Sequence, residues 1–363
     1  MENKLAIIIP AYKTSHIEEV FRCLKNQTCQ QFNLYVFDDA SPYDIRSYFY
    51  RYFTESNHVH FHRFEENMGG LNLSEHWNRC LQMTDEEEWV WYFSDDDIMS
   101  IDCVESFYEN LQNPDVCDVM RFTLNGTNEA NEFLSFRNPE TTTLTCEEFF
   151  SQIYLGKIDA RMPEFILRRS KLLQIGGFVP YDLAWRSDNA TVMRMTYPHY
   201  IYNLPKGEVL WRWGEDNISG LDALNKRKNA VTVQFFNWVD DFFKTHGLKY
   251  AMTEEELLKI YAYSLLPEKD ASPLEILSDI ATKLKLITTE EQRKVFMLAG
   301  EKSLVMHICN GISVPLEKRL DYVTEKNQKH LKLFRLVLVV SVIELTIILL
   351  MLSILLGKQH FAI

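Results

Sequence analysis

The sequence lacks the features that mark several protein classes. Its 363 residues include only seven cysteines, an odd number without a C-x-x-C pair, so neither a disulfide framework nor a structural zinc site is expected. The 13 glycines and 11 prolines are too few for a collagen-like or low-complexity chain. The first apolar run, Leu5–Ile9, is too short for the core of a signal peptide. The scattered cysteines therefore predict free thiols in a reducing cytoplasm.

Positively charged side chains are also fewer than negatively charged ones. The chain has 38 Lys and Arg against 51 Asp and Glu, a formal net charge of −13. Such a chain gains no general attraction to phosphates, so we expect no nucleic-acid partner. A phosphorylated ligand would need a local counter-charge, such as a metal ion held by carboxylates. The G-x-x-x-x-G-K-[ST], H-E-x-x-H and G-x-S-x-G patterns are absent, which removes support for P-loop, zincin and α/β-hydrolase chemistry.

One long hydrophobic run stands near the carboxyl end. Residues 336–356 carry a single charge, Glu344, and as a helix would measure about 31 Å, the thickness of a bilayer core. Six Lys and Arg lie in the twenty residues before the run, and only Lys358 follows it. The positive-inside rule then predicts a single-pass membrane protein whose larger part lies in the cytoplasm. Glu344 is a candidate contact with a membrane partner or a second copy of this chain. The alternative is a buried helix of a globular or oligomeric core.

The first half of the chain alternates apolar and amphipathic segments. We expect strands over 5–9, 33–37, 59–64, 89–93 and 116–122, and helices over 17–24 and 71–83. This alternation predicts a parallel α/β sheet whose ligands bind beyond the carboxyl ends of the strands. Capping-box pairs at 253/256, 272/275 and 288/291 predict a mainly helical second half. The expected organisation is an α/β domain over 1–220, a helical segment over 221–330 and the membrane helix.

Two of the expected strands end in acidic clusters. Ser94-Asp95-Asp96-Asp97 places three carboxylates side by side, and their hard oxygens suit Mn²⁺ or Mg²⁺ if they are not a solvated loop. Asp38 and Asp39 could accept bonds from a base or a ribose hydroxyl, or form an Asx turn before a proline. Both clusters are therefore candidate ligand sites.

Three further segments have both a functional and a structural interpretation. The loop Asn67–Gly70 allows a ligand to approach the backbone, or is only a turn. Asp188, after the glycine pair 176–177, is a candidate general base or a helix N-cap. Arg212, between two tryptophans, is a candidate clamp for a diphosphate or part of a strand edge.

Taken in order, these segments resemble glycosyltransferase family 2 over about residues 1–220. The sequence LAIIIPAY resembles the first strand and turn of that family, and VFDDAS is similar to its D-D-x-S nucleotide motif. SDDDI resembles its D-x-D region, and GGFVPYDLAWRSD its GGF…ED segment. WRWGEDNIS looks like the loop that closes over the diphosphate. The resemblance implies a GT-A (Rossmann-like) fold, nucleotide-sugar donors and inversion of the anomeric centre.

The resemblance also implies residue roles. Asp188 takes the role of the catalytic base, although Ser187 stands where the family usually has Glu. Asp96 and Asp97 become metal ligands for Mn²⁺ or Mg²⁺, with Ser94 where many members have an Asp. The implied nucleotide-sugar-binding residues are Pro10, Ala11, Tyr12, Asp38, Asp39, Asn67, Gly69, Asp95 and Arg212.

The function implied is transfer of a sugar from a UDP-sugar to an acceptor hydroxyl. Membrane attachment fits a glycan or lipid-linked glycan acceptor in cell-surface polysaccharide synthesis. The serines at 94 and 187 keep open a second hypothesis, a catalytically inactive, membrane-anchored nucleotide-binding scaffold. A nucleotidyltransferase would need a glycine-rich basic loop after the first strand, and IIIPAYKTSH contains no glycine.

Overall fold

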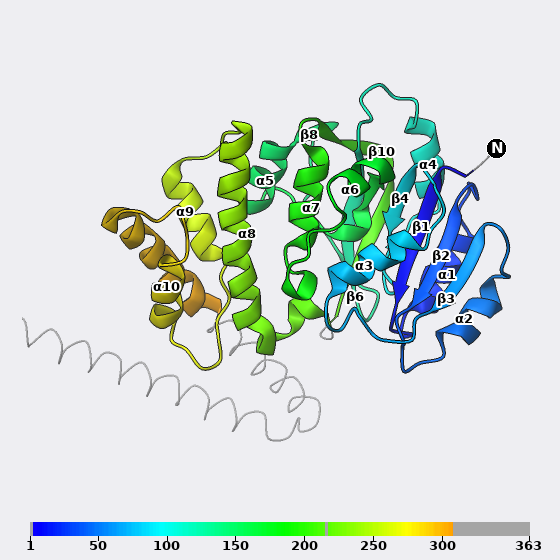
Figure 1. The fold of residues 1–363 in the computed structure, drawn as a ribbon, viewed down its shortest axis with the longest axis horizontal. Coiled ribbons are helices and arrows are strands. Elements are labelled where there is room, and N and C mark those ends of the chain that lie inside the picture. Colours follow the sequence, from blue (N-terminus) through cyan, green and yellow to red (C-terminus); the bar gives the residue numbers. More distant parts are fainter. Residues whose placement is uncertain (1–2, 215–216, 308–363) are drawn as a thin grey trace, which may run out of the picture. The chain divides into compact units, whose positions relative to one another are not determined.

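The computed structural model describes residues 3–214 and 217–307 (Figure 1). Contacts divide the chain into a compact unit of Met1–Leu304 and a unit of Val305–Ile363, and all elements named below belong to the first. The predicted membrane span, 336–356, lies outside the described residues. Within the described ranges, no helix has both the length and the apolar character needed to cross a bilayer.

A mixed sheet of ten strands organises the first unit. Its parallel part has the order β3-β2-β1-β4. These strands are β1 (Leu5–Ala11), β2 (Asn33–Asp38), β3 (Val59–Arg63) and β4 (Trp89–Tyr92). The predicted parallel arrangement is therefore confirmed for the first four strands. Residues of β1 are buried in the cores on both faces of the sheet, so every position of the strand favours an apolar side chain. This is why a continuously apolar segment such as LAII forms β1.

Beyond β4 the sheet departs from the predicted pattern. β9 (Phe165–Arg168) inserts antiparallel between β4 and β6 (Val119–Asn128). The long β10 (Tyr200–Trp213) then pairs parallel with β6 and antiparallel with β5 (Ile98–Met99). The short β7 (Phe133–Leu134) and β8 (Thr143–Thr145) pair with β6 and β10. As a result, residues 97 and 212 become neighbours although they are far apart in the chain.

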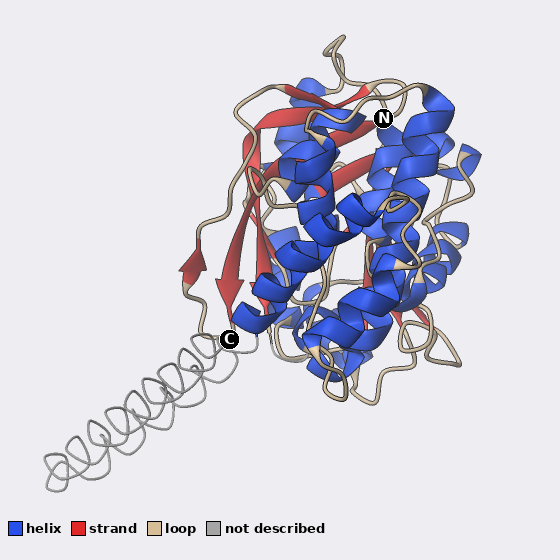
Figure 2. Cartoon of the chain, turned by 90° about the vertical axis from the view of Figure 1, so that its left-hand side faces the viewer, coloured by secondary structure: helices blue, strands red, loops and turns tan. Residues whose placement is uncertain are grey.

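Helices cover both faces of the sheet (Figure 2). One face packs against α1 (Ile17–Lys25), α2 (Ile45–Tyr52) and α4 (Cys103–Asn110). The other face packs against α3 (Leu73–Gln82), α5 (Cys146–Tyr154), α6 (Arg169–Gln174) and α7 (Ser187–Thr196). The same core continues into α8 (Asn225–His246), α9 (Glu254–Tyr263) and α10 (Pro273–Ala281). The helical segment after residue 220 therefore shares its hydrophobic core with the sheet.

Two of the predicted capping boxes form at the starts of helices. Thr253 with Glu256 begins α9, and Ser272 with Glu275 begins α10. The third prediction was wrong by one residue, because the Oγ1 of Thr289 accepts the backbone N–H of Gln292. A threonine pair offers two capping hydroxyls, and the structure uses the second of them.

Candidate active site

The carboxyl ends of β1, β2 and β4 meet at one edge of the sheet. Ala11, the last residue of β1, pairs with Asp38 of β2, and the N–H of Phe93 after β4 bonds to the carbonyl of Ile8. The predicted residues Pro10 and Ala11 therefore lie at this edge, and the side chain of Tyr12 beyond them is 42% exposed. The segments predicted to bind a nucleotide start from neighbouring strand ends.

Asp95 fixes the turn that follows β1. Its Oδ2 accepts the backbone N–H groups of Tyr12 and Lys13, each at 2.7 Å. The side chain is buried, and this burial raises the pKa of Asp95 against the lowering effect of the two N–H groups. Asp95 thus joins the acidic segment to the turn, and its contact with a nucleotide stays a prediction.

Asp96 and Asp97 occupy different environments. Asp97 is fully buried, its Oδ1 accepts the backbone N–H of Arg212 at 2.7 Å, and its Oδ2 has no partner among the described residues. Burial raises the pKa of Asp97 to about 7. Asp96 retains some exposure, and its Oδ2 lies 3.8 Å from the Nζ of Lys13. Burial, then the charges of Asp97 and Asp95, raise the pKa of Asp96.

These two carboxylates offer hard oxygen donors, the ligand type that Mg²⁺ and Mn²⁺ prefer. No described residue donates a hydrogen bond to the carboxylate of Asp96. The Oδ2 atom of Asp97 also lacks a hydrogen-bond partner among the described residues, so it is a second hard oxygen ligand. Mg²⁺ is commonly held by one or two carboxylates, with waters and phosphate oxygens completing its shell. Among the described residues, no group of three or more His, Cys, Asp or Glu side chains is arranged to hold a metal. The fit therefore depends on a ligand supplying the remaining oxygens.

Asp39 holds the predicted glycine loop. Its carboxylate accepts the N–H groups of Met68 at 3.0 Å and Gly69 at 2.7 Å, and it forms an ion pair with Arg79. A Cβ on Gly69 would lie 2.7 Å from the Oδ2 of Asp39, so this close approach needs glycine. The side-chain amide of Asn67 donates to the carbonyl of Asp39 at 3.2 Å, which closes the loop from the other side.

Asp38 is likewise satisfied within the protein. Its Oδ1 accepts the N–H of Ser41 at 2.8 Å, and its Oδ2 pairs with Arg63. The hydroxyl of Ser41 in turn donates to the carbonyl of Tyr12 at 2.6 Å. A buried carboxylate needs such partners because its charge is poorly solvated. The structure thus brings Asp38, Asp39, Asn67 and Gly69 to the same edge, and their contact with a nucleotide stays a prediction.

Arg212 differs from its predicted use as a diphosphate clamp. Its side chain is 1% exposed, and its guanidinium donates to the carbonyls of Asp96 and Asn128 and to the side chains of Asn131 and Glu19. A buried cation needs acceptors from the chain, and these four bonds leave it inside the protein. In this conformation Arg212 positions the backbone of the acidic segment, so the prediction that it binds the diphosphate is not supported.

Lys13 is the cation at this edge that sequence reasoning missed. Its side chain is 34% exposed, its Nζ lies 3.8 Å from Asp96, and the same Nζ donates to Asn217 at 2.8 Å. The lysine directly follows the turn IIIPAY in the sequence, and that position was the available signal. Lys13 is therefore placed to meet negative charge beside Asp96.

The segment that carries Asp188 is fixed by Asn78 of α3. The backbone N–H of Phe178 donates to Asn78 Oδ1 at 2.8 Å, and Asn78 Nδ2 donates back to the Phe178 carbonyl at 3.4 Å. Gly177 has φ +82°, and a Cβ there would collide with the amide oxygen of Asn78. The segment after the glycine pair 176–177 is thus tied to α3, the helix that follows the loop Asn67–Gly70.

Asp188 lies in the first turn of α7 and is not its N-cap. Arg186, with φ +66°, takes the cap position, while Asp188 Oδ1 accepts the N–H of Asn189 at 2.8 Å. Burial raises the pKa of Asp188, and the Asn189 N–H and the charges of Arg161 and Arg186 oppose the rise. A carboxylate with a raised pKa is a better proton acceptor near neutral pH. The alternative interpretation as a helix cap is therefore wrong.

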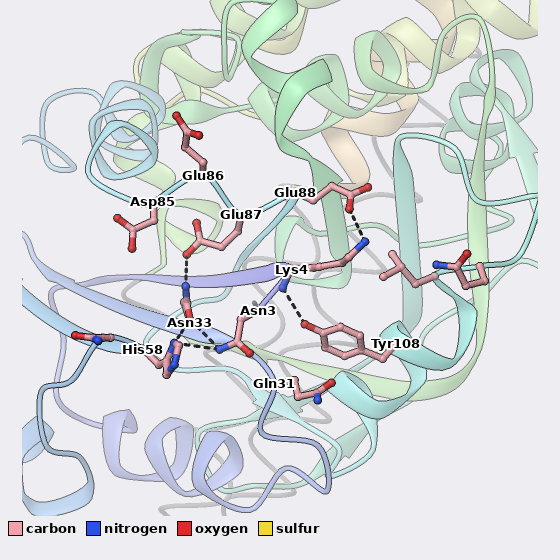
Figure 3. A pocket seen from close by; sticks show the side chains of 13 residues that line it. Asn3, Lys4, Gln31, Asn33, His58, Asp85, Glu86, Glu87, Glu88 and Tyr108 are labelled. Atoms are coloured by element: carbon pink, nitrogen blue, oxygen red, sulfur yellow. Dashed lines mark hydrogen bonds and ion pairs between the residues drawn. The ribbon is translucent and has the colours of Figure 1, made fainter. Parts of the chain in front are cut away.

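A cavity of about 640 Å³ lies at the opposite edge of the sheet (Figure 3). Its lining includes Lys4, Asn33, His58 and Glu88, which stand at the amino ends of β1, β2, β3 and β4. Within it, the Oε1 of Glu87 accepts bonds from the side chain of Asn33 at 2.7 Å. None of the predicted site residues lines this cavity. The site residues predicted on β1, β2 and β4 thus gather at the other edge, at the carboxyl ends of these strands.

Comparisons with known proteins bear on the fold and on the family that the chain resembles. Residues 6–176 match the family described as Glycosyl transferase family 2. The crystal structure of S. aureus TarS 1-349 in complex with UDP-GlcNAc is similar, with a TM-score of 0.53 and 16% identity, over 83% of this chain and 90% of that chain. The same protein in complex with UDP gives a TM-score of 0.44 at 16% identity and the same coverage. No curated protein matches the chain. Residues 6–176 are thus similar to glycosyl transferase family 2, and the chain has a mixed α/β fold of GT-A type.

Proposed function

We propose that this chain is an inverting, metal-dependent glycosyltransferase that moves a sugar from a UDP-sugar to an acceptor hydroxyl. The observation that carries the proposal is the environment of Asp188, a carboxylate with a raised pKa in the first turn of α7, which follows the segment 6–176 that matches the family 2 model. The choice of a UDP-sugar is supported by the UDP-GlcNAc complex of the structurally similar TarS.

The donor is proposed to lie over the strand ends. Tyr12 offers an exposed ring for the nucleobase, and Lys13 offers a cation to the diphosphate beside Asp96. Asp96 and Asp97 are the residues that would hold Mn²⁺ or Mg²⁺. When bound, the cation supplies Lewis-acid stabilisation of the negative charge on the departing nucleoside diphosphate.

Asp188 is proposed to accept the proton of the acceptor hydroxyl. The hydroxyl oxygen forms a bond to the anomeric carbon as the bond from that carbon to the diphosphate oxygen breaks. The electron pair of the broken bond leaves with the nucleoside diphosphate, and the proton passes to the Asp188 carboxylate. Attack from the face opposite the leaving group inverts the centre in one displacement and needs no enzyme nucleophile.

The acceptor is proposed to be a glycan or a lipid-linked glycan in cell-surface polysaccharide synthesis. Support comes from the sequence, in which the apolar run 336–356 and the cations before it indicate a single-pass anchor with the catalytic domain in the cytoplasm. Glu344 within that run is a candidate contact for a homo-oligomer or a membrane partner.

Ligand-dependent thermal melting of the full chain in detergent tests the proposal. UDP, GDP, CMP and dTDP are each added with and without Mn²⁺. A ligand at about 100 times its Kd stabilises the folded state by about 2.7 kcal/mol, which raises the melting temperature by several degrees. We expect a shift with UDP that requires Mn²⁺, followed by release of UDP from a UDP-sugar. No shift with any nucleotide would overturn the proposal, and binding without turnover would favour the inactive scaffold.

A further inference from the structure

The turn that leads into α7, residues 181–187, has a strained backbone. Leu183, Ala184 and Arg186 have φ values of +61°, +49° and +66°, in the left-handed region that side chains other than glycine rarely adopt. Such a conformation persists only where surrounding contacts hold it. The turn ends at the start of α7, whose first turn carries Asp188. The position of Asp188 therefore depends on the contacts that hold residues 181–187.

One face of α8 is both buried and polar. It is formed by Asn225, Lys228, Asn229 and Thr232, whose spacing places them on the same side of the helix, and each is at most 3% exposed. A helix usually buries apolar side chains, and polar ones in such places need partners. The two asparagines donate to backbone carbonyls of the segment 266–267. The other two side chains of this face contact the strained turn.

Trp185 is the residue of the turn that meets α8, which runs beside the segment leading into α7 (Figure 1). Its Nε1–H donates to the Oγ1 of Thr232 at 3.1 Å, and the Nζ of Lys228 lies 5.3 Å from its ring centroid. The guanidinium carbon of Arg186 lies 5.2 Å from the same ring. Arg186 is the N-cap of α7, and its carbonyl accepts the N–H of Ala190 at 3.0 Å. Trp185 thus connects α8 to the first turn of α7.

The residues at 228 and 232 are chemically specific in what they do to this ring. The Nζ of Lys228 donates to the carbonyl of Leu221 at 2.9 Å, which holds the cation beside the indole of Trp185. A valine at 232 would have nearly the shape of threonine but would leave the indole N–H without this acceptor. The two side chains therefore fix the orientation of the ring, which apolar packing alone does not specify.

We propose that Lys228 and Thr232 are positioning residues that hold Asp188 in place for proton transfer by orienting Trp185. The inference rests on the proposed function, because it concerns the residue proposed there as the base. It gives the helical segment after residue 220 a part in catalysis, since α8 supplies both side chains. A base must lie within hydrogen-bond reach of the proton that it accepts, so a small displacement of α7 should lower kcat and spare donor binding.

Thr232→Val in the full chain tests this link, because it removes the hydroxyl and keeps nearly the same shape. We expect kcat for transfer to fall by at least about tenfold, with the KM for the UDP-sugar unchanged. Thr232→Ser restores the hydroxyl and should return kcat to near that of the parent. Lys228→Met, which keeps the length and removes the charge, should lower kcat in the same way. Arg227→Gln is the matched control, because Arg227 is exposed and pairs with Asp182 at the surface, and it should leave kcat unchanged.

Two double variants separate positioning from a general loss of structure. Trp185→Phe removes the indole N–H, so adding Thr232→Val to it should cause no further loss through the same bond. In an Asp188→Asn background, Thr232→Val should leave the remaining rate unchanged, because no base is left to position. Hydrogen exchange of the amides in 181–190 gives a readout without turnover, and we expect faster exchange in Thr232→Val than in the parent or Arg227→Gln.

Equal kcat, or equal exchange at 181–190, in the parent and Thr232→Val overturns the inference. A fall in kcat that persists at full size in the Asp188→Asn background also overturns it, because that loss would not act through the base. Each of these results leaves the proposed function intact, since the parent still transfers sugar. A parent that releases no UDP refutes the proposed function and this inference together.

Discussion

Replacing Asp188 by asparagine removes the proposed proton acceptor and keeps the size and shape of the side chain. The amide oxygen can still accept the N–H of Asn189, so the start of α7 should stay formed. General-base catalysis contributes about 10²- to 10⁴-fold to rate, which corresponds to roughly 3–5 kcal/mol of the activation barrier. We therefore expect transfer by Asp188→Asn to fall by at least about 10²-fold, while the affinity for UDP is unchanged.

The same change should not destabilise the protein. Burial raises the pKa of Asp188 in the folded state above that in the unfolded chain. A carboxyl group with a raised pKa favours folding only while it is protonated, so its ionisation at neutral pH opposes folding. Asparagine removes that ionisation, and we expect the melting temperature at pH 7 to be equal to or above that of the parent.

The assay measures release of UDP from a UDP-sugar in the presence of acceptor, with melting curves on the same preparation. Asp182→Asn is the matched control, because Asp182 lies six residues earlier, is exposed and is paired with Arg227. Losing that surface pair costs about 0–1 kcal/mol of stability and should leave transfer intact. Transfer by Asp188→Asn within about threefold of the parent would refute the assignment of the base.

Three further predictions concern the same edge of the sheet. Asp96→Ala should abolish the Mn²⁺-dependent part of the UDP-induced melting shift, and a shift of normal size would contradict the metal site. Gly69→Ala should cost about 1–3 kcal/mol in urea unfolding, because its Cβ would lie 2.7 Å from a carboxylate oxygen of Asp39; unchanged stability would contradict the role of Asp39 in the loop. As the pH is lowered, kcat/KM should fall with a midpoint above pH 3.8, because burial raises the pKa of Asp188 from that ordinary value. A limb at or below pH 3.8 would show that Asp188 is not the titrating base.

Many residues at this edge of the sheet could be predicted from sequence, because each strand there is indicated by a few consecutive residues. The run Leu5–Ile9 is apolar at every position, which indicates a strand buried on both faces, and the structure places it at the centre of the parallel strands. Acidic residues directly after two such strands must reach the same edge once the strands are parallel. The approach of Asp38 to the turn after Ala11 followed from that rule.

The remaining features depend on contacts that the sequence does not reveal. Arg212 is buried because β10 runs beside β6 and brings its backbone to Asp97, a pairing across more than a hundred residues. Sequence alone showed an arginine between two tryptophans, which fits either a diphosphate clamp or part of a strand edge. The position of Lys13 over Asp96 likewise depends on Asp95 holding the turn. The insertion of β9 between β4 and β6 reverses the strand direction where alternation suggested a continued parallel sheet.

The central claim is that this chain transfers sugar from a nucleotide sugar with inversion. The most direct measurement follows the full chain with UDP-GlcNAc and Mn²⁺ by NMR, and records UDP release and the anomeric configuration of the first product. We expect release of UDP, a product with the β-configuration and loss of both signals in Asp188→Asn. No release of UDP from UDP-GlcNAc, UDP-glucose or UDP-galactose by a well-folded sample, or a product that retains the α-configuration, would contradict it.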